Sequence, residues 1–253
     1  MILLLDGTSD SRNLAVFLKN NGYDLVATAT TDEGADKLIN NNIKTINKKL
    51  LYNDLLERCK ELQVDTVIDA THPYAYSIHE NSLRVAEKLK ILHIRYERPE
   101  IVYENGSITY VDNYDGAVKE VSKINSDNIL VTTGIKNVEY FRDIIKIKNV
   151  YFRILPEPDS IKLLSAMGVK MKNIIAMEGP FNIELNRAIY KNYKIGALIT
   201  KDSGFDADTK IRAAIENNIK AIIIKRKKYN YKNIAYNYNE VINILKGDKN
   251  IKS

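Results

Sequence analysis

The chain has 253 residues, 45% hydrophobic and 28% charged, with a formal net charge of +6. These values are typical of a globular protein with one large domain or two small ones. One cysteine and three histidines exclude an internal disulfide framework and argue against a structural zinc site. Because there is no apolar run of roughly 20 residues and no signal peptide, we expect a cytoplasmic, metal-free protein.

The basic balance favours an acidic partner. The lysines are scattered along the chain, and the densest cluster is "IKRKKYNYK" (Ile224–Lys232). We interpret these lysines as a solvated surface, so we expect binding of neither nucleic acid nor membrane.

Short apolar runs alternate with longer helical patterns. The predicted strands are Ile2–Leu5, Leu25–Ala29, Val64–Ile68, Leu92–Arg95, Ile129–Val131, Val150–Ile154, Asn173–Met177, Ala197–Thr200 and Ala221–Ile224. The predicted helices are Ser9–Asn20, Tyr52–Leu62, Ala75–Leu89, Asp115–Lys123, Asp159–Met167, Ile183–Lys191 and Asp208–Asn217. Continuous Val, Ile and Leu runs are typical of strands covered on both faces, so the alternation predicts parallel sheets built from βαβ units.

The middle of the chain interrupts this pattern. "IVYENGSITYV" (Ile101–Val111) places two β-like runs around Asn-Gly, which predicts a hairpin. After residue 125, "ILVTTGIKNVEYF" repeats the strand, Thr/Gly loop and helix of "ILLLDGTSDSRNLAVF". We therefore expect an α/β protein with two Rossmann-like parallel-sheet domains, 1–125 and 126–246, with a cleft between them and a frayed tail at 247–253.

Ligands of open α/β sheets bind beyond the carboxyl ends of the strands. The first such loop, Asp6–Arg12 ("DGTSDSR"), has small residues and the start of a helix, which suit a phosphate. The alternative is a plain helix cap made by Ser9 or Asp10. The second strand ends in small and hydroxylated residues such as Thr28, and the first acid, Asp32, follows later. This ending favours NADPH over NADH, which usually needs an acid there.

The third loop, "DATHPYA" (Asp69–Ala75), places an acid, a hydroxyl, an imidazole and a phenol in a row. Pro73 fits the first turn of the next helix, and His72 and Tyr74 then lie at the positive end of that helix, which favours a neutral imidazole. The alternative is a structural, hydrogen-bonding His72.

Further polar loops follow later strands. After Leu92–Arg95 comes "RYERP", which is either a salt-bridged rim or a carboxylate-binding site. The second half contributes "TTGIK" (Thr132–Lys136), "RILP" (Arg153–Pro156), "MEGPFNIELN" (Met177–Asn186) and "KDSG" (Lys201–Gly204). So many such loops at strand ends indicate a bound ligand.

Taken together, the stretches "GTSDSRNLA", "DATHPYA", "RYERP", "VTTGIKN", "RILP", "MEGPFNIELN" and "TKDSGFDADTKIRAA" resemble the precorrin-6A reductases of corrin-ring biosynthesis, including the cobalt-precorrin-6A form. The resemblance runs from Gly7 to Arg226. It departs from the family pattern at Asp6, Ala207-Asp208 and Arg226-Lys227, where the family usually has glycine, paired glycines and Arg-Pro.

The resemblance implies an NADPH-dependent reductase with two Rossmann-like domains and a polycarboxylate tetrapyrrole between them. The implied reaction transfers hydride from the nicotinamide to C19 of the ring and adds a proton at C18. Arginines and lysines on the loops would pair with the ring's carboxylates, which gives the net positive charge a purpose. We expect a monomer or a weak homo-oligomer.

With this reaction in view, the candidate residues fall into three sets. The catalytic candidates are Tyr74, His72 and Lys201. The cofactor-binding candidates are Gly7, Thr8, Ser9, Arg12, Thr28 and Thr71. The substrate-binding candidates are Thr133, Gly134, Lys136, Arg153, Ser203 and Gly204. The alternatives are a nucleotide-dependent transferase with two facing Rossmann-like domains and a non-catalytic nucleotide-binding module.

Overall fold

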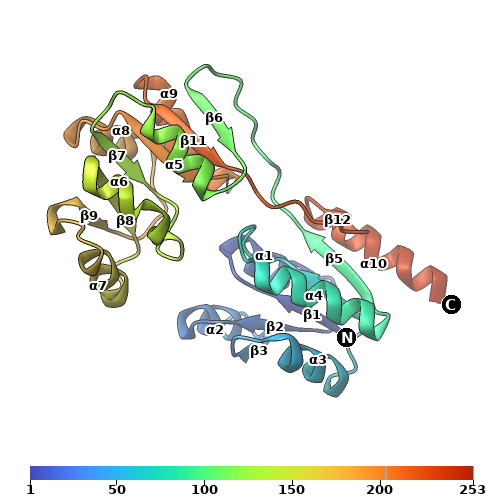
Figure 1. Ribbon diagram of the computed structural model, residues 1–253. Coiled ribbons are helices and arrows are strands. Elements are labelled where there is room, and N and C mark those ends of the chain that lie inside the picture. The colour runs from blue at the N-terminus through green and yellow to red at the C-terminus, as the bar shows by residue number, and fades with distance from the viewer. Residues whose placement is uncertain (203, 253) are drawn as a thin grey trace. The chain divides into compact units, whose positions relative to one another are not determined.

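The computed structural model describes residues 1–202 and 204–252. The chain divides into two compact units, the first formed by Met1–Pro99 with Lys228–Ser253 and the second by Glu100–Lys227. Over the described residues, each unit is built on a six-stranded parallel sheet with helices on both faces (Figure 1). The prediction of two Rossmann-like α/β domains is confirmed.

The first unit has the strand order β12-β5-β4-β1-β2-β3. Its strands are β1 (Ile2–Leu5), β2 (Leu25–Ala29), β3 (Lys44–Asn47), β4 (Thr66–Asp69), β5 (Leu92–Tyr96) and β12 (Ile234–Ala235). Its helices are α1 (Ser9–Asn20), α2 (Asp32–Ile39), α3 (Tyr52–Glu61), α4 (Tyr76–Leu89) and α10 (Tyr238–Lys252). This is the dinucleotide-binding strand order, with β12 in the sixth position.

The second unit has the order β6-β11-β10-β7-β8-β9, in which β7 to β11 repeat the topology of β1 to β5, and the sixth position is taken by β6, which precedes them in the chain. Its strands are β6 (Ile108–Val111), β7 (Asn128–Val131), β8 (Asn149–Ile154), β9 (Ile174–Ala176), β10 (Ala197–Lys201) and β11 (Lys220–Ile224). Its helices are α5 (Tyr114–Ser122), α6 (Arg142–Ile147), α7 (Pro158–Ala166), α8 (Ile183–Asn192) and α9 (Phe205–Glu216), with short 3₁₀ turns at η1 (Val138–Phe141) and η2 (Met171–Asn173).

The first strand shows why apolar runs become central strands. Ile2 and Leu4 face the core beneath α1, α2 and α10, whereas Leu3 and Leu5 face the core beneath α3 and α4. Successive side chains of a strand point to opposite faces, so a strand covered on both sides needs apolar residues at every position. The same alternation in β7 sends Leu130 to the core of α8 and α9 and its neighbours to the core of α5, α6 and α7.

The structure divides the chain at different places from those predicted. The expected hairpin does not form, because β6 pairs in parallel with β11 and the residues before Asn105 lie outside the described strands. The segment 100–125 therefore belongs to the second unit. The chain end returns to the first unit, where β12 pairs with β5, and α10 extends to Lys252 in place of a frayed tail.

Several elements escaped prediction because their local patterns are weak. The strand β3 has the sequence KTIN, and its residues are exposed or half-buried at the sheet edge. The helix α2 is eight residues long, with Thr31 as its N-cap. Short edge elements carry little apolar periodicity, so their formation depends on the neighbouring strand.

Candidate active site

The order of the strands places one crevice in each unit. From β1 the chain runs outward to β2 and β3 and then returns to β4 on the other side of β1. Such a reversal opens a crevice beyond the carboxyl ends of the two central strands. In the second unit β7 and β10 are the equivalent pair. The loops that follow these four strands are therefore the candidate site, and each of them contains predicted site residues.

The loop after β1 contains a buried carboxylate, that of Asp6, which is 6% exposed. Its Oδ1 accepts a hydrogen bond from the Ser11 hydroxyl, and its Oδ2 lies 3.2 Å from Nη1 of Arg12. The negative charge is thus compensated within the first turns of α1. Gly7 and Ser9 remain exposed beside it, at the positive end of the α1 dipole.

The helix cap of α1 is Thr8, not Ser9 or Asp10. Its side chain accepts from the Ser11 backbone N–H at 3.1 Å, while Ser11 Oγ accepts from the Thr8 N–H at 2.9 Å, which closes a capping box. The Asp10 carboxylate accepts from the hydroxyls of Tyr96 at 3.0 Å and Tyr238 at 2.9 Å. The carboxylates of Asp6 and Asp10 therefore both have side-chain partners.

The first loop packs against the loops of both neighbouring strands. A Cβ on Gly7 would lie 3.4 Å from Thr71 Cα and from the His72 nitrogen, about van der Waals contact, so the loops after β1 and β4 lie against each other. On the other side, Thr28 at the end of β2 is 6% exposed, and its Oγ1 accepts from the Asp6 N–H at 3.4 Å. The structure therefore brings Gly7 and Thr71 together and directs Thr28 toward the first loop.

A buried network holds the loop after β4. The Asp69 carboxylate is fully buried and accepts from the Thr71 N–H at 3.1 Å and the Thr71 hydroxyl at 2.6 Å. It also lies 2.5 Å from His79 Nδ1 and accepts from Arg95 Nη1 at 3.0 Å. Arg95 Nη1 donates to the carbonyl oxygen of Thr71 at 3.0 Å as well. Thr71 is therefore used in holding the loop, and its hydroxyl faces inward.

The charges of this network set its protonation. Burial by itself would raise the pKa of Asp69, but the charge of Arg95 and the contacts of His79 and Thr71 hold it well below its usual value. The pKa of Arg95 is raised, since Asp69 and Glu97 outweigh the opposing effect of burial. Asp69 and Arg95 are therefore an ion pair at neutral pH.

The predicted catalytic residues His72 and Tyr74 are half-buried in the same loop. The Tyr74 N–H donates to His72 Nδ1 at 3.3 Å, and their ring centroids lie 5.8 Å apart. An accepting Nδ1 carries no proton, as in the neutral imidazole that we expected. The helix α4 begins only at Tyr76, so Pro73 lies in the turn before the helix, not in its first turn.

In the second unit, Lys201 ends β10 and Thr133 follows β7, the adjacent strand. Burial lowers the pKa of Lys201 to about 8. Its Nζ lies 6.0 Å from the centroid of the Tyr114 ring. The hydroxyls of Tyr114 and Thr133 are buried and make no hydrogen bond of standard geometry among the described residues. Thr133 and Asn137 lie close enough to the Tyr114 phenol to oppose the increase in its pKa that burial causes.

Arg153 lies near the carboxyl end of β8, and its side chain is buried within the second unit. It is 7% exposed, donates from Nη1 to Asn186 Oδ1 at 2.8 Å, and lies over the Phe181 ring at 4.3 Å. Burial lowers the pKa of Arg153. This arginine therefore supports the loop before α8, whereas Lys136 is exposed after β7.

Two glycines shape the loops of the second unit. Gly134 has φ +78° and Gly204 has φ +70°, a region that side-chain-bearing residues rarely adopt. Gly204 precedes α9, which begins at Phe205, three residues before the predicted start at Asp208. Arg226 donates to the carbonyl oxygen of Asp202 at 2.9 Å, next to this loop. The predicted substrate contact Ser203 lies outside the described residues.

Two residues of the site were missed in the sequence. His79 lies inside the amphipathic helix α4, and Tyr114 opens α5; each is separated in sequence from its partners. A histidine among the buried positions of a helix is the signal that marks His79. The aromatic Tyr114 gives no such signal, since an aromatic residue at a helix start is ordinary core packing.

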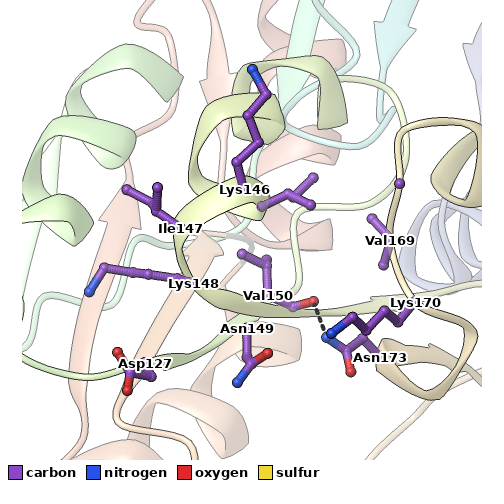
Figure 2. Close-up of a pocket in the computed structure, with 11 residues that line it drawn as sticks. Asp127, Lys146, Ile147, Lys148, Asn149, Val150, Val169, Lys170 and Asn173 are labelled. Atoms are coloured by element: carbon purple, nitrogen blue, oxygen red, sulfur yellow. Dashed lines mark hydrogen bonds between the residues drawn. The ribbon is translucent and has the colours of Figure 1, made fainter.

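A depression of about 360 Å³ lies elsewhere, at the amino ends of β7, β8 and β9 (Figure 2). Its lining includes Asp127, Asn149 and Asn173, and Asn173 Nδ2 donates to the Val150 carbonyl oxygen at 3.3 Å. Because ligands of this fold bind at the carboxyl ends, this depression is not part of the candidate site.

Among the described residues there is no group of three or more His, Cys, Asp or Glu side chains that could hold a metal ion. Within the same part of the chain, no helix is long and apolar enough to span a membrane.

Comparison with known proteins adds to this geometry. The model of the family described as "Precorrin-6x reductase CbiJ/CobK" matches residues 1–246. The cobalt-precorrin-6A reductase of Priestia megaterium is 36% identical over 250 residues, covering 97% of this chain and 98% of that protein. The enzyme of the same name from Methanococcus maripaludis is 37% identical over 251 residues, with coverage of 97% and 98%.

Among solved structures, CobK precorrin-6A reductase superposes with a TM-score of 0.80, covering 97% of this chain and 96% of that one. At 20% sequence identity, this match bears on the fold.

Proposed function

The chain belongs to the precorrin-6x reductase CbiJ/CobK family, and on that premise we propose that it uses NADPH to reduce precorrin-6A, or its cobalt form, to the corresponding precorrin-6B. NADPH supplies the hydride, and the protein orients the two rings and provides a proton. We also propose that it works in the cytoplasm as a monomer or weak homo-oligomer.

The observation that carries this proposal is the loop after β1. Gly7 and Ser9 are exposed at the start of α1, where backbone N–H groups and the helix dipole favour a pyrophosphate. A carboxylate there would repel the cofactor, but Asp6 is paired with Ser11 and Arg12. The residues of the loop therefore fit NADPH.

The end of β2 supports NADPH in preference to NADH. The strand β2 ends at Ala29. Two threonines follow before the first acid, Asp32, which already lies in the first turn of α2. A carboxylate at the strand end would bind a ribose 2′-hydroxyl and repel a 2′-phosphate. Thr28 supports the loop after β1 through its hydrogen bond to the Asp6 N–H.

We assign the proton to Lys201. With a pKa lowered to about 8, its ammonium is mostly protonated at neutral pH and releases a proton more readily than an ordinary lysine. The exposed Lys136 and the hydroxyl of Thr133 are offered to substrate carboxylates. The neutral His72 and the phenol of Tyr74 form the wall of the first crevice.

The test is an assay of purified protein with NADPH and cobalt-precorrin-6A, in which the absorbance of the reduced nicotinamide is measured over time. We expect the amount of NADPH oxidised to be proportional to the amount of ring reduced, and oxidation to be slower when NADH replaces NADPH. Parallel reactions with metal-free precorrin-6A identify the natural form of the ring. NADPH binding without oxidation would favour the non-catalytic module, and absence of both would refute the reductase.

A further inference from the structure

The loop after β4 is held by a second group besides Arg95. His79, from the second turn of α4, is 1% exposed and lies beneath the loop. Its Nδ1 is 2.5 Å from Asp69 Oδ2, and its Nε2 is 3.3 Å from the carbonyl oxygen of Pro73. One imidazole thus bridges the first residue of the loop and the proline that precedes Tyr74.

Both ring nitrogens of His79 face acceptors. Asp69 is ionised, and a peptide carbonyl accepts only, so each contact needs an N–H on the histidine. A neutral imidazole has one N–H and would leave the other nitrogen facing an acceptor lone pair. The imidazolium has two and satisfies both contacts.

Glu97 lies on the outer side of Arg95. Its Oε2 accepts from Arg95 Nε at 2.8 Å, and its side chain is 19% exposed. The fully buried charges next to His79 are therefore those of Asp69 and Arg95, and the protonation of His79 follows from its two acceptors, not from a count of charges.

The other neighbours of His79 add no competing charge. His93 from β5 is kept neutral, since burial lowers its pKa to about 4. Tyr229, from the segment that returns to the first unit, packs edge-on against the His79 ring with centroids 5.7 Å apart. This contact places an aromatic ring beside the buried imidazole.

We propose that His79, as an imidazolium bridging Asp69 and the Pro73 carbonyl, is a positioning residue that sets the backbone of the loop carrying His72 and Tyr74. The effect of His79 on catalysis rests on the proposed function, whereas its role in holding the loop does not. His79 touches neither substrate nor cofactor; it acts through the loop. A shift of about 1 Å in such a loop can cost up to ~100-fold in rate.

Two measurements test the proposal. The first is the ¹⁵N spectrum of the imidazole nitrogens near neutral pH, which the chain's three histidines keep simple to assign. We expect both His79 nitrogens to be protonated and His93 to be neutral. A His79 ring with one protonated nitrogen would overturn the proposal, whether or not the protein proves to be a reductase.

The second measurement is steady-state kinetics of His79→Asn and His79→Gln. The first keeps a donor near the position of Nδ1 and the second near that of Nε2, so each keeps one of the two hydrogen bonds. We expect kcat to fall at least ~10-fold in both, with the KM for NADPH within about 2-fold, because position and not binding is lost. Wild-type kcat in either folded variant would refute the role.

The matched control is His93→Asn. It removes the contact of His93 Nε2 with Ser82 Oγ, which joins α4 to β5, and leaves the hydrogen bonds of His79 to the loop after β4 intact. Its kcat should stay near the wild-type value. An equal loss of kcat in the control would show that α4 packing alone matters and would overturn the proposal. If the wild-type protein shows no reduction, the proposed function fails and the spectrum alone decides the state of His79.

Discussion

Asp69 and Arg95 are direct register partners on the neighbouring strands β4 and β5, and their carboxylate and guanidinium lie 3.0 Å apart with at most 1% of either residue exposed. The pair joins the end of the central strand to the backbone of the loop beyond it, because Arg95 Nη1 also reaches the carbonyls of Asp69 and Thr71. The loop thus inherits the rigidity of the sheet.

Replacing Arg95 should destabilise the first unit strongly. Arg95→Met removes the guanidinium partner of the buried Asp69 carboxylate and leaves it only the contacts of Thr71 and His79, and we expect a loss of about 3–5 kcal/mol in the free energy of unfolding. Urea denaturation measures this loss. The exposed ion pair of Arg58 with Glu61 provides the control, since Arg58→Met should cost less than about 1 kcal/mol. Equal costs would contradict the structural weight given to Arg95.

The Asp69 carboxylate should make the fold sensitive to acid. Its pKa is lowered in the folded state, so the folded protein binds its proton at lower pH than the unfolded chain does. The resulting stability is present above the unfolded value of about 3.9 and is lost as pH falls below it toward the folded value. Asp69→Asn should be less stable at neutral pH and show a flatter decline below that value in unfolding monitored by circular dichroism.

The pH dependence of turnover should report Lys201. If the ammonium gives the proton, kcat falls as pH rises through about 8, the pKa to which burial lowers this side chain. Lys201→Arg keeps the charge but holds its proton at every accessible pH, so its residual rate should lack that alkaline limb. An unchanged limb in the variant would assign the proton to another group.

Asp6 should weaken nucleotide binding relative to glycine. Asp6→Gly removes a negative charge from the loop that precedes α1 and frees Arg12 from its carboxylate partner. We expect NADPH to bind roughly 2–5-fold more tightly, the effect of about 1 kcal/mol for a charge at a helix start. Fluorescence titration with NADPH measures it. Asp36→Asn on the neighbouring helix α2 is the control and should leave the affinity unchanged.

Cys59 should be unreactive in the folded protein. The thiol is 1% exposed in α3, and burial raises its pKa to about 11, so the thiolate that reacts is scarce at neutral pH. A colourimetric thiol reagent should label it only after denaturation. Rapid labelling of the native protein would show that α3 opens readily.

Much of the fold was predictable from local pattern. The central strands β1, β4, β7 and β10 are buried at nearly every position, and each contains a continuous apolar run that can be recognised in the sequence. The edge strands β6 and β12 were not predictable in this way. Asn105-Gly106 favours a hairpin locally, but β6 forms its hydrogen bonds with β11, more than a hundred residues away.

The candidate site, like the fold, was predictable only in part. The loops after β1 and β4 were identified from Gly7, Ser9 and the DATHPYA row, because these residues lie next to one another in the sequence. The partners of those residues were not. Thr71 was expected to face a ligand, and its hydroxyl instead donates to Asp69.

The sequence by itself determined the two repeated α/β patterns, the family and the loops where chemistry belongs, because apolar alternation and short motifs are local properties. Only the tertiary structure decided that the chain end returns to the first sheet, that Asp6 is paired by Arg12, and that His79 lies under the loop after β4. Those facts depend on contacts between distant segments, and the burial that gives them their energy arises only when the strands and helices pack.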